Sequence, residues 1–153
     1  MPGKKAPTTI AAAGGRAVGA VHAGWRGLAG GAVGAALSTL CEAAGCAPQD
    51  VVVWLGPCIG PRHFEVGADV LQAFDQSPLR VDPLRFIARA RADGAPRWLA
   101  NLPQLARDRL QRAGVRQVSG GDWCTVEDRA NFFSYRRDGV TGRLAAAVWI
   151  RSS

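Results

Sequence analysis

The most constraining feature of this sequence is the run Val51–Leu55, which is apolar at every position and ends in the Gly- and Pro-rich stretch Gly56–Pro61. A continuous apolar run of this length is typical of a strand covered on both faces, and glycine and proline predict a loop directly after it. Ala17–His22 and Val115–Val118 have the composition of further short strands. Helical patterns lie between these runs, so we expect a sheet with helices on both faces.

Three segments have the pattern of helices. Gly27–Ala44 carries its large apolar residues near helical spacing, and Val66–Phe74 is a shorter candidate. Asn101 is placed to cap a third helix that reaches Ala113. The arginine-rich stretch 76–97 gives no clear pattern.

The C-terminal part of the chain predicts a β-hairpin. Phe132–Tyr135 and Leu144–Ile150 flank a Gly-containing turn, which makes the expected sheet mixed rather than all parallel. The 153 residues suffice for one domain. We therefore divide the chain into a short basic N-terminal segment, residues 1–16, and a single domain, residues 17–153.

The composition narrows the function classes. Hydrophobic residues make up 48% of the chain and charged residues 20%, which predicts a folded core and not a disordered chain. Lys and Arg total 19 against 12 Asp and Glu, and this excess favours anionic partners such as phosphate, nucleotides or nucleic acid. No apolar stretch approaches the roughly 18 residues of a membrane span. We therefore expect no membrane partner. The four irregularly spaced cysteines predict reduced thiols, and hence a cytoplasmic protein.

The first segment that carries chemistry joins a strand end to a helix start. His22 ends the predicted strand Ala17–His22, and glycines separate it from Arg26 at the start of the next helix. A helix N-terminus favours anions, and glycine lets a ligand approach the backbone. The alternative is a histidine satisfied within the core beside a surface arginine.

The second segment is the loop after the buried strand, where α/β sheets commonly bind ligands. It contains Cys58, Arg62 and His63. A cysteine near a histidine suggests a nucleophile, whereas a cysteine in a Gly/Pro turn is commonly a small apolar residue. We favour the second interpretation.

The third segment groups several arginines with hydroxyl side chains: Ser134, Tyr135, Arg136, Arg137 and Arg143. Arginine binds phosphate through two parallel hydrogen bonds, and an aromatic ring can stack on a base. The alternative is a solvated basic turn on an edge hairpin.

Together, the three segments resemble one family closely. Their motifs are His-Ala-Gly-Trp-Arg-Gly, Gly-Pro-Cys-Ile-Gly-Pro-Arg-x-Phe-Glu-Val-Gly and Phe-Phe-Ser-Tyr-Arg-Arg-Asp-Gly-x-Thr-Gly-Arg, and the resemblance runs from about Pro7 to Ile150. The family was long labelled polyphenol oxidase or laccase-like and is now regarded as purine nucleoside phosphorylases. The resemblance implies an α+β fold, a three-layer α/β/α sandwich with a mixed β-sheet. It also implies phosphorolysis of adenosine, inosine, guanosine or methylthioadenosine, with adenosine deamination as a side activity.

The resemblance also implies a metal, zinc or copper, held by two histidines and one cysteine. His22 matches the last of these ligands. When Pro7 is laid on the proline of the family's Asp-Cys-Leu-Pro segment, Lys5 takes the cysteine's position and Lys4 the aspartate's. No histidine precedes His22 in the sequence. We therefore expect a truncated member with an incomplete metal site.

These observations assign roles to individual residues. Two arginines are assigned to catalysis, Arg26 and Arg62, because the oxocarbenium-like transition state of phosphorolysis needs positioning and electrostatic stabilisation. Four residues are assigned to substrate binding: Ser134, Tyr135, Arg136 and Arg143. Purine nucleosides and phosphate are the expected partners.

Two other functions remain open. One is a catalytically inactive, truncated family member without the metal. The other is a basic nucleic-acid-binding domain, which we disfavour because the arginines cluster in Gly-rich turns and do not spread along a groove. An exposed sheet edge further predicts a homodimer.

Overall fold

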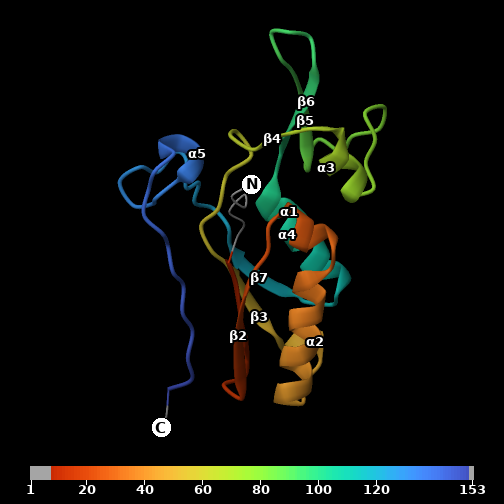
Figure 1. Ribbon diagram of the computed structural model, residues 1–153. Coiled ribbons are helices and arrows are strands. Elements are labelled where there is room, and N and C mark those ends of the chain that lie inside the picture. Colours follow the sequence, from red (N-terminus) through yellow and green to blue (C-terminus); the bar gives the residue numbers. More distant parts are fainter. Residues whose placement is uncertain (1–7, 152–153) are drawn as a thin grey trace.

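A computed structural model describes the backbone of residues 8–151 and the side chains from residue 14 onward (Figure 1). Its larger sheet has four strands in the order β2 (Ala17–His22), β1 (Thr8–Ala13), β3 (Val52–Leu55) and β7 (Gln117–Gly120). β1 is antiparallel to both neighbours, and β3 is parallel to β7. The predicted mixed sheet and the α+β class are therefore confirmed. The sheet also begins earlier than the boundary at residue 17, because β1 lies within the segment 1–16.

The strand β3 explains the apolar run from which the fold was predicted. Val51, Val53 and Leu55 are fully buried, whereas the intervening Val52 is 47% exposed. Alternate residues of a strand point to opposite faces. The prediction that both faces are covered is therefore wrong within the described residues: one face packs on the helices, and the other is open at Val52.

Helices cover one face of the larger sheet. α1 (Trp25–Ala29), α2 (Ala32–Ala44) and α4 (Leu102–Arg112) contact one another, and α2 packs against β1 and β2. Figure 1 shows α2 and α4 side by side next to the sheet. Of the three predicted layers, residues 8–151 thus show the mixed sheet and one helical layer. None of these helices is long and apolar enough to cross a bilayer.

The predicted helix Gly27–Ala44 is wrong because it is two helices. Gly31 has φ +85°, a left-handed conformation that an α-helix does not contain. The chain therefore ends α1 at Ala29 and restarts in α2 at Ala32.

A second, smaller sheet lies above the larger sheet in the view of Figure 1. Its antiparallel strands are ordered β4 (Glu65–Val66), β6 (Pro96–Ala100) and β5 (Phe86–Ala90). α3 (Ala68–Ala73) packs on β4 and β6 and lies inside the range expected for the second helix, whose first residue belongs to β4. The hairpin β5–β6 lies mostly in the stretch 76–97, which shows no clear pattern in the sequence.

The C-terminal hairpin predicted at Phe132–Tyr135 and Leu144–Ile150 is wrong. Tyr135–Asp138 form a short helix, α5, and residues 139–151 contain no strand. The reason lies in Arg137, whose guanidinium donates to the carbonyl oxygens of residues 125, 126 and 132 and to the Asp138 carboxylate. These bonds hold the segment as a compact turn.

The start of α4 offers a local test of the fold. The Asn101 side chain accepts a hydrogen bond from the Gln104 N–H at 3.2 Å and donates one to the Leu84 carbonyl at 3.2 Å, which confirms the predicted cap. Asn101→Ala is expected to lower the free energy of unfolding by about 1 kcal/mol, as loss of a cap commonly does. Urea unfolding followed by circular dichroism measures it. Gln111→Ala, at an exposed position of the same helix, is the control and should change stability little.

Candidate functional site

Arginines from three separate elements converge on a hollow of about 540 Å³ at the start of α3, which we call the arginine hollow. Arg91 follows β5, Arg97 lies in β6 and Arg136 lies in α5. The remaining lining residues come from β4 and the first turn of α3: Glu65, Val66, Gly67, Ala68 and Asp69. The volume falls within the range of small-molecule sites in proteins.

The charges in the arginine hollow are unevenly paired. Arg91 Nε lies 3.0 Å from Glu65 Oε1, so this arginine is neutralised by its neighbour. Within the described residues, Arg97 and Arg136 form no ion pair with a carboxylate. Arg136 Cζ lies 5.8 Å from the ring centroid of Phe64, which is buried. The ring packs against the guanidinium group of Arg136. Arg97 and Arg136 therefore keep hydrogen-bond donors that an anion can use.

A second cluster surrounds Cys124. Arg62 binds both carboxylate oxygens of Glu127, with Nε 2.8 Å from Oε1, and His63 Nε2 lies 3.1 Å from the same Oε1. The hydrogen bond from Arg62 lowers the pKa of Glu127 below its usual value. The Gly60 N–H donates to Cys124 Sγ at 3.1 Å. The structure thus engages Arg62 in a bidentate pair, and an anion would have to compete with Glu127 for it.

Cys58 behaves as a small apolar residue. Its side chain is 1% exposed, and burial, reinforced by the nearby Cys124, raises the pKa of its thiol to about 12. Because the thiolate is the nucleophilic form, a thiol with this pKa stays protonated and inert at neutral pH. The interpretation as an apolar cysteine is confirmed.

His22 and Arg26 lie at the junction of β2 and α1, as the sequence indicated. His22 is exposed, and Arg26 Cζ stacks 4.4 Å from the ring centroid of Trp25. Among the described residues, the group of three potential metal ligands with closely spaced donor atoms is His63, Cys124 and Glu127, and His22 does not belong to it. The described residues therefore do not fit a metal at His22.

The third predicted segment is divided by the fold. Ser134 is buried at the start of α5, Tyr135 is 49% exposed, and Arg136 points into the arginine hollow. Arg143 is exposed in the C-terminal stretch and does not line the arginine hollow. The sequence also makes Arg137 a candidate for anion binding. In the structure its guanidinium donates to backbone carbonyls and to Asp138 within the turn described above.

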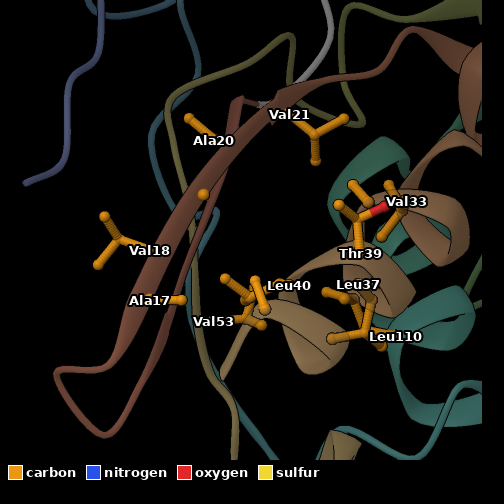
Figure 2. Close-up of a pocket in the computed structure, with 13 residues that line it drawn as sticks. Ala17, Val18, Ala20, Val21, Val33, Leu37, Thr39, Leu40, Val53 and Leu110 are labelled. Carbon is orange, nitrogen blue, oxygen red and sulfur yellow. The ribbon is translucent and has the colours of Figure 1, made fainter. Parts of the chain in front are cut away.

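A second hollow, of about 320 Å³, lies between β2 and α2 (Figure 2). Figure 2 shows Leu37, Leu40 and Val53 pointing into the space between helix and sheet. Its one polar side-chain group, the Thr39 hydroxyl, is bonded to the Ala35 carbonyl at 3.1 Å. This hollow offers no charge for phosphate, so the arginine hollow is the better candidate site.

Known proteins resemble this chain in sequence and in structure. The family model described as multi-copper polyphenol oxidoreductase laccase matches residues 6–151. Proteins named purine nucleoside phosphorylase YfiH are 45% identical in Shigella flexneri and 44% in Escherichia coli, each over 139 residues that cover 89% of this chain and 52% of the relative. A crystal structure of a Neisseria meningitidis protein of the DUF152 family is 42% identical, with a TM-score of 0.69 over 91% of this chain and 54% of that one. This chain spans about half the length of each.

Proposed function

The chain belongs to the multi-copper polyphenol oxidoreductase laccase family, and from this membership we propose that it is a purine nucleoside phosphorylase that binds phosphate in the arginine hollow. The names of the relatives support the reaction class. The observation that carries the assignment of the site is the pair Arg97 and Arg136, two guanidinium groups without a carboxylate partner in one hollow of suitable volume.

In phosphorolysis, a phosphate oxygen forms a bond to the ribose C1′ while the bond from C1′ to the purine nitrogen breaks. The products are the sugar 1-phosphate and the free base, whose nitrogen takes up the proton that the phosphate loses. Arg97 and Arg136 would hold the phosphate monoanion or dianion under C1′ and supply the electrostatic stabilisation that this charge-separated transition state needs. Ser134 and Tyr135 precede Arg136 directly, and we assign them to the ribose hydroxyls and to stacking on the base. Catalytic roles for Arg26 and Arg62, and substrate binding by Arg143, stay predictions.

The metal of the family has no role in this scheme. Zinc or copper at His22 would activate water or polarise the substrate. Because the described residues do not complete a ligand set around His22, we derive no reaction step through a metal there. Adenosine deamination, which needs an activated water, is proposed as a side activity whose activating group is not assigned.

The purified 153-residue chain tests the proposal directly. Adenosine, inosine, guanosine and methylthioadenosine are each incubated with and without phosphate, and the bases and ribose 1-phosphate are separated by chromatography. We expect free base and sugar phosphate in equal amounts only when phosphate is present. Inosine formed from adenosine without phosphate would report deamination. No base at any phosphate concentration would overturn the proposal in favour of the inactive alternative.

The homodimer and the cytoplasmic location stay predictions.

A further inference from the structure

Three side chains with different metal-binding atoms meet between two loops. His63 follows the loop after β3, and Cys124 and Glu127 lie in the loop after β7. Their ligand atoms all lie within 4.8 Å of one another. We propose that His63, Cys124 and Glu127 bind a zinc ion, at a site that does not include His22.

The spacing of the donors suits a tetrahedral ion. Bonds of about 2.0–2.3 Å from zinc to oxygen, nitrogen and sulfur place ligand atoms roughly 3.3–3.8 Å apart. His63 Nε2 and Glu127 Oε1 are 3.1 Å apart, close to this separation. The His63 and Glu127 side chains are 40% and 31% exposed, and zinc binding would draw the donor atoms, which lie within 4.8 Å of one another, to this separation.

Backbone hydrogen bonds hold the two loops together at the site. The Cys58 N–H donates to the Trp123 carbonyl at 3.2 Å, and the Thr125 N–H donates to the Cys58 carbonyl at 2.8 Å. Gly60 completes the junction, because a Cβ there would lie 3.0 Å from the Cβ and 3.1 Å from the Sγ of Cys124. The sulfur is therefore fixed by a rigid surrounding, which is how proteins preorganise metal ligands.

Neighbouring groups orient the ligands. The Gly60 N–H donates to Cys124 Sγ at 3.1 Å and so fixes the direction of the sulfur. Arg62 holds both carboxylate oxygens of Glu127, with Nε 2.8 Å from Oε1. Each carboxylate oxygen has two lone pairs, so Oε1 can face the ion while it keeps its hydrogen bond from Arg62. A carboxylate held by an arginine in this way is a common arrangement around metal ligands.

The donor set selects the class of metal. One imidazole, one thiolate and one carboxylate form a mixed nitrogen, sulfur and oxygen set, which zinc accepts in tetrahedral sites. A hollow of about 210 Å³ borders Cys124 and Glu127 and has room for a fourth ligand from solvent. Binding replaces the thiol proton of Cys124, which leaves to solvent as the metal–sulfur bond forms.

Cobalt(II) is the probe, because it occupies zinc sites and has absorption bands that report its ligands. The chelator-treated full chain is titrated with Co²⁺, and Zn²⁺ is then added in competition. We expect a sulfur-to-cobalt charge-transfer band and strong d–d bands of four-coordinate cobalt, saturating at one metal per chain and lost when zinc is added. Cys124→Ser should remove the charge-transfer band. Glu127→Gln and His63→Ala should each weaken binding by more than the roughly 10- to 100-fold that the loss of a supporting residue costs.

Two control variants separate this site from its alternatives. The double variant Cys41→Ser/Cys46→Ser removes the other pair of accessible cysteines and should leave the spectrum unchanged. His22→Ala should leave it unchanged as well. Loss of the bands in either control, or their persistence in Cys124→Ser, would overturn the proposal, and so would the absence of a sulfur band in the unaltered chain. Circular dichroism of each variant checks that it folds. The absorption readout needs no enzymatic activity, so failure of the phosphorylase proposal would leave this test intact.

Discussion

Replacing Arg136 by alanine is expected to lower kcat/KM for phosphorolysis about 10- to 100-fold. The guanidinium is supported on the buried Phe64 ring and faces the arginine hollow without a carboxylate partner, so its hydrogen bonds are available to phosphate. A hydrogen bond to a charged group contributes about 1.5–3 kcal/mol, and each 1.4 kcal/mol is a factor of ten in rate. Initial rates over a range of phosphate concentrations measure the effect.

The loss should appear in a specific way if Arg136 binds phosphate. KM for phosphate is expected to rise more than KM for the nucleoside. Arg136→Lys should recover only part of the loss, because lysine keeps the charge but not the planar pair of donors. Arg116→Ala is the matched control, since it removes one positive charge at an exposed position between α4 and β7. Equal losses in Arg136→Ala and Arg116→Ala would show a general charge effect and contradict a phosphate contact.

The parts of the fold that the sequence predicts well are those set by local chemistry. The strand at Val51–Leu55 and the cap at Asn101 depend on residues within a few positions of each other, and both are found. The break at Gly31 was missed because glycine is compatible with several conformations, and only the structure shows that this one has φ +85°. The β5–β6 hairpin does carry a local signal, the turn-forming pair Asp93–Gly94 between its two strands.

The C-terminal prediction failed for a non-local reason. The apolar run Leu144–Ile150 suits a strand, but a strand needs a neighbour, and none pairs with this stretch within residues 8–151. Arg137 adds to this by bonding carbonyls up to 12 residues earlier in the chain. Neither effect can be read from a local pattern.

The candidate site was predicted only in part, because the fold brings together residues that are far apart in the sequence. Arg136 was identified from its motif, whereas Arg91 and Arg97 reach the hollow through a hairpin that sequence reasoning did not find. The cluster at Cys124 joins residues more than 60 positions apart, as the Gly60–Cys124 hydrogen bond shows. Such long-range meetings follow from the strand order, in which β3 lies parallel beside β7.

At this junction between β3 and β7, adding a single methyl group at Gly120 is expected to cause a large loss of stability. Gly120 pairs with Leu55 and has φ +73°, and a Cβ there would lie well inside contact distance of the Leu55 carbonyl oxygen and 2.7 Å from Trp54 Nε1. The clash is with backbone and cannot be relieved by a side-chain rotation. It also threatens the hydrogen bond from the Gly121 N–H to the same carbonyl, 2.7 Å long.

Gly120→Ala is therefore expected to lower the free energy of unfolding by about 3–5 kcal/mol, in the range of the most damaging single substitutions. Gly31→Ala provides the control, because Gly31 also has a positive φ but a Cβ there meets nothing within 4 Å. Gly31→Ala should lower the free energy of unfolding by only the roughly 1–2 kcal/mol that the left-handed conformation costs a residue with a side chain. Urea unfolding followed by tryptophan fluorescence compares the two variants. Similar losses in both would mean that backbone conformation, and not the contact between the two strands, sets the requirement for glycine at this junction.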